Sequence, residues 1–448
     1  MPKRNSSKPC ANTTVCCLRP TLPGRATKVT RGFARHWSNA WSTFLDPFSI
    51  WTETQCGKLR LPKPGLYICI SNTLTMNFEF TEEHRMIQNM AREFAQKELL
   101  PGVIERDDKQ EFPQELVHRM GELGFMGMMV DPKYGGGGMD TVSYVLAMEE
   151  LSKVDASASV MVSVNNSLVC WGLETFGTEE QKEKYLPRLA AGEIIGAFCL
   201  SEPEAGSDAT SQRTEAIDHG DHYVLNGTKN WITNGSRAGL YLVVAQTDRE
   251  KKHRGINCLI VEPDMPGFEI GRKEDKLGIR GSDTHTLLFN DIKVPKENRV
   301  GEDGFGFKFA MKTLDGGRIG IAAQALGIAS GAYELSMKYA KERKSFNTEI
   351  INHQAVAFKL AKMATDIDGV RLLCLKAARA KDLKQDYAQL AAMAKLYASK
   401  VANDVAREAV QVHGGYGFVK EYHVERLFRD AKITEIYEGT SEIQRMVI

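Results

Sequence analysis

The chain has 448 residues, of which 42% are hydrophobic and 26% are charged, a composition typical of a globular protein of about three domains. The formal charge of +1 conceals an asymmetry. Residues 1–75 carry eleven Lys and Arg but two acids, which leaves 47 basic and 55 acidic residues in 76–448. This acidic body does not favour a phosphate backbone, so we expect no nucleic-acid partner. No run of about 18 apolar residues occurs, so we expect no membrane span.

Residues 1–75 differ from the rest of the chain. They are basic, rich in Ser and Thr, interrupted by Pro and Gly, and without sustained periodicity, so we expect a disordered extension. An organelle presequence has this composition and would place the protein in the mitochondrial matrix. The alternative is translation from a start upstream of Met76, and a bacterial chain would then be cytoplasmic. Both interpretations stay open.

Cysteine spacing gives no sign of a metal centre. Outside the extension the cysteines lie singly, with neither a Cys-x-x-Cys pair nor a His at ligand spacing: Cys170, Cys199, Cys258 and Cys374. We therefore expect no metal, and these residues to act as small buried apolar groups.

From Met76 the hydrophobic period changes twice. Residues 76–195 show helical spacing and predict a helical domain, with helices at 82–100, 114–123, 141–154, 156–176 and 179–191. Residues 196–300 show short runs with period two and predict an antiparallel β-domain, a small barrel or sandwich. Its expected strands lie at 223–225, 231–233, 240–245, 256–261, 268–271 and 286–289, with Asn226-Gly227 as a tight turn.

Residues 301–448 return to helical spacing. The expected helices at 307–314, 319–342, 354–383 and 386–413 are apolar on one face, which is typical of a four-helix bundle. The fold class predicted is therefore α+β, in the order helical domain, β-domain and helical bundle.

Three acids lie among apolar and aromatic residues near the end of the chain, in residues 433–442. Taken alone, most such acids are surface groups of a helix. A carboxylate beside Tyr437 and Ile436 would nevertheless have its pKa raised by poor solvation, which suits a general base working near neutral pH. By the same standard, we expect the basic run at 341–344 to be a solvated helix end and His413 to be a helix cap or a packing residue.

Three motifs carry a resemblance to a known family. They are 200–208 (Leu-Ser-Glu-Pro-Glu-Ala-Gly-Ser-Asp), 411–417 (Gln-Val-His-Gly-Gly-Tyr-Gly) with 429–431 (Arg-Asp-Ala), and 436–440 (Ile-Tyr-Glu-Gly-Thr). In this order and spacing, residues 76–448 resemble the acyl-CoA dehydrogenases. The resemblance implies the same three-part architecture, FAD held between the β-domain and the bundle, a homotetramer, and electron-transfer flavoprotein as electron acceptor.

The resemblance also assigns residues to FAD. Those near the flavin ring would be Phe198, Cys199, Leu200, Ser201, Ser207, Trp231, Ile232 and Thr233. Those near the diphosphate and adenosine would be Arg343, Phe346 and Gln354, with Gln411, Val412, His413, Gly414 and Gly415 contributed by a neighbouring subunit, and Thr440, Ser441 and Glu442 completing the site. Two departures are Asn347, where the family usually has Gly, and the end at Ile448, where relatives continue; a truncated C-terminus is one reading.

The implied reaction is α,β-dehydrogenation of an acyl-CoA thioester in fatty-acid β-oxidation or related catabolism. Glu438 would remove the α-proton while the β-hydrogen leaves as hydride to flavin N5. Some relatives carry the base at the position of Gly317, so Glu438 is the sole candidate here. The expected substrate contacts are Ser207, Asp315, Arg318 and Gly439.

The segment 163–168 resembles the short-chain, butyryl-type members, which predicts a short acyl chain. The alternatives are a branched- or medium-chain dehydrogenase, an acyl-CoA oxidase that uses oxygen, and a non-catalytic binding homologue.

Overall fold

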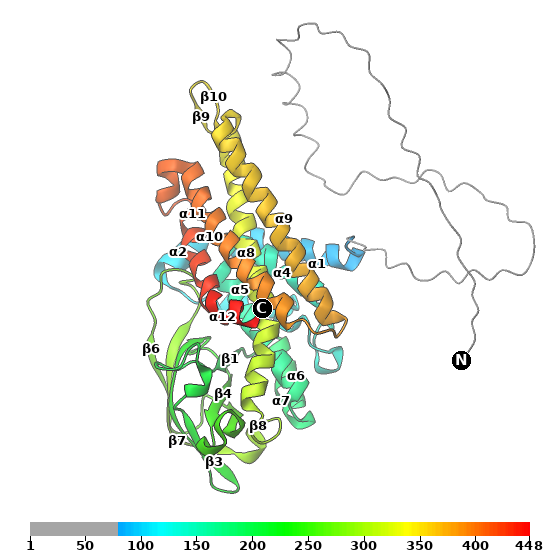
Figure 1. Cartoon of the computed structure of the whole chain (residues 1–448), viewed down its shortest axis with the longest axis vertical. Helices are drawn as coiled ribbons and strands as arrows, with labels where there is room; N and C mark the ends of the chain where they lie inside the picture. Colours follow the sequence, from blue (N-terminus) through cyan, green and yellow to red (C-terminus); the bar gives the residue numbers. More distant parts are fainter. Residues whose placement is uncertain (1–78) are drawn as a thin grey trace, which may run out of the picture. The chain divides into compact units, whose positions relative to one another are not determined.

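In the computed structural model, which describes residues 79–448, helices precede and follow an eight-stranded sheet (Figure 1). The predictions for residues 1–75 lie outside the described residues. No helix within 79–448 is long and apolar enough to cross a membrane. Cys170, Cys199, Cys258 and Cys374 are buried with free thiols, as expected.

The N-terminal helices follow the predicted spans closely. They are α1 (Glu82–Phe94), α2 (Val103–Lys109), α3 (Gln114–Glu122), α4 (Thr141–Val154), α5 (Ala156–Ser163), α6 (Trp171–Phe176) and α7 (Glu179–Ala190). The predicted helix 156–176 is continuous but contains a π-helical stretch, η5 (Val164–Cys170), between α5 and α6. The buried amides of Asn165 and Asn166 donate there to the carbonyls of Met126 and Phe125, both at 2.8 Å. These bonds fix η5 against the short 3-10 turn η3 (Phe125–Gly127), which precedes it in the chain.

The sheet has the order β6-β7-β3-β2-β4-β5-β8, with β1 beside β4. Its strands are β1 (Gly196–Cys199), β2 (Glu215–Asp218), β3 (His222–Thr233), β4 (Leu240–Gln246), β5 (Ile256–Val261), β6 (Phe268–Lys273), β7 (Thr284–Pro295) and β8 (Arg299–Val300). Most neighbours are antiparallel, as predicted, but β1 and β2 both pair with β4 in parallel.

The predicted tight turn at Asn226-Gly227 is wrong. β3 runs through both residues, and its register against β7 shifts between Leu225 and Gly227, which marks a bulge. Gly227 has φ of 147°, and a Cβ there would lie 2.7 Å from Thr214 Cα. Gly227 is therefore needed for close packing at a bulge within β3. The prediction failed because the dipeptide Asn-Gly is also the usual sequence of a tight hairpin turn.

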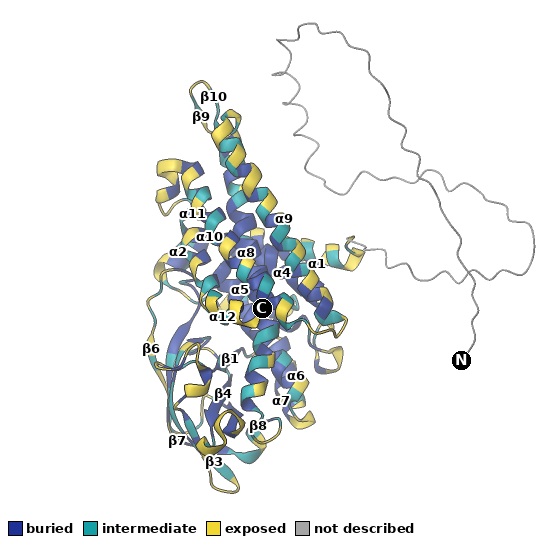
Figure 2. Ribbon diagram, in the orientation of Figure 1, coloured by how far each residue is buried: buried dark blue, intermediate teal, exposed yellow. Residues whose placement is uncertain are grey.

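The C-terminal part is built on α8 (Gly306–Glu342), one helix where two were expected. It is followed by the short hairpin β9 (Lys344–Ser345) and β10 (Thr348–Glu349), α9 (Gln354–Asp382), α10 (Ala388–His413), α11 (His423–Ala431) and α12 (Ser441–Val447). Gly316 and Gly317 do not break α8, because both are buried against neighbouring elements. Figure 2 shows that α8 is buried along much of its length. Three long helices and α11 form the bundle, and α4 packs against α8.

Candidate active site

Glu438 lies in the connection between α11 and α12 and has an unusual backbone. Its φ is +52°, and that of the following Gly439 is +93°. A left-handed Glu is strained by roughly 1–3 kcal/mol, so surrounding bonds must hold it. On one side, the hydroxyl of Tyr437 donates to Gln324 Oε1 on α8. On the other, Thr440 caps α12 by accepting a bond from Ile443 N at 3.4 Å.

The Glu438 carboxylate is poised as a base. Its Oε2 is buried and has no hydrogen-bond partner in the described chain. Burial raises the pKa of this carboxyl to about 8, against the opposing charges of Lys395 on α10 and Arg318 on α8. A base with a pKa near the working pH combines availability with proton-transfer strength.

Two of the predicted substrate residues lie near this carboxylate: Gly439 follows Glu438 in the chain, and the charge of Arg318 acts on the Glu438 carboxyl. Arg318 is 4% exposed and its Nη1 donates to Asp315 Oδ1 at 2.6 Å, so the two side chains form a pair on α8. Burial raises the pKa of Asp315. The carbonyl of Gly439 accepts bonds from Lys395 Nζ at 2.7 Å and Gln444 Nε2 at 2.8 Å. Lys395 has no sequence signal beyond a polar residue in a helix and was missed, whereas Gln444 falls in the segment 440–444 that the resemblance expects to complete the flavin site.

The segments expected near the flavin ring lie side by side. Asn230 N donates to Ser201 O at 2.8 Å, and the buried Lys229 Nζ donates to Leu200 O at 2.9 Å. These bonds join β3 to the loop after β1. Trp231 has φ of +62° and is 59% exposed. That backbone turns an indole outward, which leaves its face available to a planar ligand.

Not all predicted ring contacts present side chains to the surface. Cys199 and Ile232 are buried in the core of the β-domain, so only their backbone atoms remain for a ligand. Phe198 and Thr233 are half-buried and Ser207 is exposed. A Cβ at Gly206, beside Ser207, would meet nothing within 4 Å. This glycine therefore borders open space, as a loop that a ligand approaches does.

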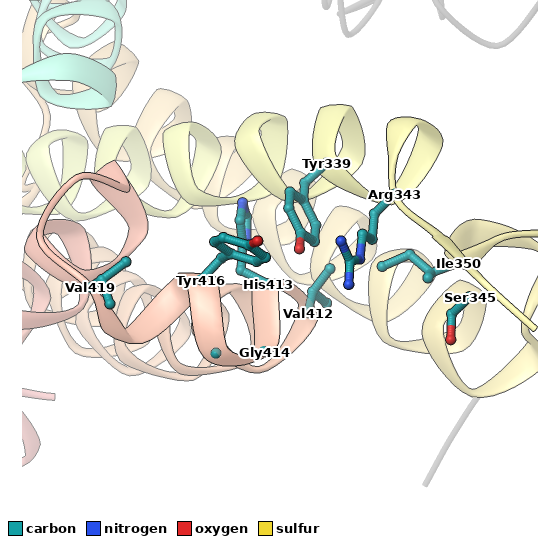
Figure 3. A pocket seen from close by; sticks show the side chains of 10 residues that line it. Tyr339, Arg343, Ser345, Ile350, Val412, His413, Gly414, Tyr416 and Val419 are labelled. Carbon is teal, nitrogen blue, oxygen red and sulfur yellow. The ribbon is translucent and has the colours of Figure 1, made fainter.

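A cavity of about 530 Å³ lies near the far end of α8 (Figure 3). Arg343 and Tyr339 point from α8 towards the end of α10, which contributes Val412, His413 and Gly414. The Arg343 guanidinium lies 5.6 Å from the centre of the Tyr416 ring and has no ion pair within residues 79–448. The rings of Tyr339 and His413 stack at 4.3 Å.

The chemistry of this cavity fits the diphosphate and purine of FAD. An unpaired guanidinium suits a phosphate, and aromatic faces suit a planar base. Gly414, with φ of +60°, and Gly415 border open space, since a Cβ on either would meet nothing within 4 Å. Burial lowers the pKa of His413, so the ring is neutral near pH 7.

Three predicted residues do not line the cavity. Phe346 is 91% exposed, and Gln354 and Gln411 are also exposed. Tyr339 and Tyr416 do line it and were missed. Tyr339 stands four residues before Arg343 on α8, and that spacing was the available signal.

The structure also differs from the expectation that Arg343 and 411–415 come from different subunits, because one chain brings Arg343 and Val412–Gly415 together. This cavity is far from Glu438. Arg343, at the C-terminal end of α8, follows Gly317 by 26 residues, which corresponds to ~39 Å along the helix axis.

Comparison with known proteins decides the family. Residues 81–193, 197–292 and 304–448 match the N-terminal, middle and C-terminal domains of acyl-CoA dehydrogenase. This chain belongs to the acyl-CoA dehydrogenase family. The resemblance stated from sequence and the α+β fold class are thereby confirmed.

Relatives in this family align over most of their length. The short-chain-specific acyl-CoA dehydrogenase of Clostridium acetobutylicum is 51% identical over 373 residues, covering 83% of this chain and 98% of the relative. A subunit of the caffeyl-CoA reductase–Etf complex of Acetobacterium woodii is 46% identical, covering 82% and 98%. The structure of butyryl-CoA dehydrogenase from Megasphaera elsdenii has a TM-score of 0.82 and 48% identity, covering 83% and 98%.

Proposed function

We propose that this acyl-CoA dehydrogenase converts short-chain acyl-CoA thioesters to trans-2-enoyl-CoA, with FAD as cofactor and Glu438 as the base. The observation that carries the proposal is the Glu438 carboxylate, which has a buried, unpartnered oxygen and a raised pKa. The identity of about half to short-chain and butyryl-CoA enzymes supports the substrate class. The predicted branched- or medium-chain alternatives differ only in the acyl group.

Each residue of the site has a separate role in the proposed reaction. Glu438 Oε2 accepts the proton on the α-carbon, which becomes acidic as the thioester oxygen takes on enolate charge. The backbone N–H of Glu438 is the donor expected for that oxygen, and such donors contribute roughly 3–4 kcal/mol each. Bound FAD supplies the two-electron acceptor chemistry. Arg318 and Asp315 are proposed to orient the thioester.

We propose that each FAD lies across two subunits of a homo-oligomer, and a homotetramer stays our prediction. Gly317, beside the Glu438 carboxylate, and Arg343 lie ~39 Å apart along the axis of α8, and one extended FAD molecule is too short to span that separation, which supports this proposal. The segments expected near the flavin ring, 198–201 and 231–233, and the Arg343 cavity of the same chain would therefore bind two different FAD molecules. Light scattering of the purified protein with its flavin content tests this, and a monomer with full FAD contradicts it.

The proposed acceptor is electron-transfer flavoprotein. The relative from Acetobacterium woodii named as part of an Etf complex supports this choice over oxygen. Stopped-flow mixing of the substrate-reduced protein with either acceptor distinguishes a dehydrogenase from the alternative oxidase: a dehydrogenase is reoxidised by the flavoprotein and slowly by air.

The proposed location depends on the extension. We propose the mitochondrial matrix if residues 1–75 act as a presequence, and the cytoplasm if the chain is bacterial. N-terminal sequencing of the protein isolated from its source tests this, because an imported protein lacks the extension.

The central test is the visible spectrum under anaerobic conditions as butyryl-CoA is added. The wild type should lose its oxidised-flavin absorbance, and Glu438→Gln should keep it. Bound flavin that only longer or branched thioesters bleach would favour the alternative substrates. A folded protein without flavin would favour the non-catalytic homologue.

A further inference from the structure

Lys395 is a buried lysine without a counterion in contact. It stands in α10 with no exposed surface, and no carboxylate lies within ion-pair distance of it in residues 79–448. Its Nζ donates to the carbonyl of Gly439 at 2.7 Å. An ammonium group in such a place is costly unless something retains it. The charge that acts on it most favourably is that of Glu438.

The Gly439 carbonyl belongs to the strained connection that carries Glu438. Gln444, also without exposed surface, approaches the same connection from α12 and donates to Gly439 O at 2.8 Å and Glu438 O at 3.2 Å. Lys395 from α10 and Gln444 from α12 therefore share the carbonyl of Gly439, and Gln444 also binds the carbonyl of Glu438. Their bonds offset the cost of the positive φ at Glu438.

We propose that Lys395 is a positioning residue for the base: it fixes the Glu438–Gly439 backbone through the Gly439 carbonyl, and its charge favours the ionised Glu438 carboxylate. The inference rests on the proposed role of Glu438. Gln444 holds the Glu438–Gly439 backbone in place but carries no charge, whereas Lys395 holds the backbone and also carries a positive charge.

Other groups that act on Glu438 do not duplicate this charge. Arg318 on α8 is cationic but is paired with Asp315. Tyr144 on α4 and the neighbouring Tyr437 are neutral, because burial raises the pKa of both phenols. Burial lowers the pKa of Lys395 to about 8, so the lysine remains cationic at pH 7. Of the two cations within residues 79–448 that act on the Glu438 carboxyl, Lys395 is thus the one that no carboxylate pairs with.

The test measures α-proton exchange alone. A 3-thia acyl-CoA has sulfur at the β-position and no hydrogen to give as hydride, so the holoenzyme can only remove and return its α-proton. In D₂O, Glu438 takes a proton and a deuteron returns to the same carbon, which mass spectrometry follows from pH 6 to 10. Lys395→Met should move the rising limb up by about one pH unit or more and slow exchange at pH 7 about tenfold or more, because an adjacent opposite charge shifts a carboxyl pKa by 1–3 units.

Matched variants separate charge from bonding. Lys395→Gln retains a donor but no charge, so its limb should move as that of Lys395→Met does; it also serves if the Met variant does not fold. Lys395→Arg retains the charge and should keep the wild-type limb. Gln444→Met should slow exchange at every pH with the limb in place. Lys400→Met on the same helix, an exposed lysine paired with Asp404 at 2.6 Å, should match the wild type throughout.

A wild-type limb in a folded neutral variant at position 395 overturns the proposal, as does a displaced limb in Lys395→Arg or Gln444→Met. Glu438→Gln distinguishes the two levels of inference. If it still exchanges the α-proton, the proposed base is wrong. If it does not, and the neutral Lys395 variants keep the wild-type limb, only the role of Lys395 falls.

Discussion

Gly317 on α8 faces the carboxylate of Glu438 so closely that no side chain fits between them. A Cβ built on Gly317 would lie 2.8 Å from Cδ of Glu438, closer still to its Oε2, and 2.7 Å from Cδ2 of Leu168. The position where some relatives are expected to carry their base is therefore filled here by the carboxylate of Glu438. The two arrangements exclude each other sterically, and a glycine is the condition for this one.

Gly317→Ala should abolish most activity while the protein stays folded. The new methyl group must displace the carboxylate, and a misplacement of about 1 Å costs roughly 100-fold in rate. We expect flavin bleaching by butyryl-CoA to slow by about that factor, with flavin content unchanged. The control is Gly316→Ala, whose Cβ would meet nothing closer than Lys381 Nζ at 3.5 Å. Equal losses in the two variants would show that helix glycines, rather than room for the carboxylate, are what matters.

Glu438 should also make stability depend on pH. Its folded pKa of about 8 exceeds the ordinary 4.5, so the native state holds a proton that the unfolded state releases. That contribution to stability is complete below about pH 4.5 and is lost as pH rises towards 8, by at most about 1.4 kcal/mol per pH unit. Glu438→Gln has no such loss. The melting temperature of Glu438→Gln should therefore rise relative to that of the wild type as the pH is raised from 5 to 7.

The control for that series is Glu93→Gln. Its exposed carboxyl is hydrogen-bonded by Lys97, which holds the pKa below the ordinary value, so it is ionised throughout pH 5 to 7. The difference in melting temperature between this variant and the wild type should stay constant. A constant difference for Glu438→Gln as well would mean that its carboxyl is not poised as the burial indicates.

Sequence patterns predicted the elements well where hydrophobic period decides them, as in α4 and β5. They failed where distant packing decides. The predicted helices 307–314 and 319–342 left a gap between them, yet α8 runs through it, with Gly316 and Gly317 buried against neighbouring elements. The proposed base, Glu438, has a sequence signal in its motif. Lys395 has no such signal, because it contacts Gly439 across 44 residues and a lysine in a helix ordinarily points to solvent.

Arg343→Met should weaken FAD binding. An arginine without an ion pair is available to the diphosphate, and a hydrogen bond to a charged group contributes about 1.5–3 kcal/mol. We expect the dissociation constant of FAD, measured by fluorescence on reconstitution of the apoprotein, to rise about tenfold or more. Lys341→Met, an exposed cation two residues earlier that does not line the cavity, should leave it unchanged. If the dissociation constant of FAD is unchanged in Arg343→Met, the diphosphate does not bind in this cavity.

Lys229 and Glu202 form a buried ion pair beneath the ring-side loop, with Nζ and Oε1 2.7 Å apart and the side chains 0% and 4% exposed. Lys229→Met leaves Glu202 charged and unpaired, which costs about 3–5 kcal/mol. It also frees Leu200 O, so flavin binding should weaken with stability. Urea unfolding measures the first effect and flavin content the second. Lys229→Met with Glu202→Gln should recover part of the stability because the orphaned charge is gone, although Glu202 also accepts bonds from Arg213 N and Thr214 N. A double variant no more stable than Lys229→Met would place the cost in those backbone bonds instead.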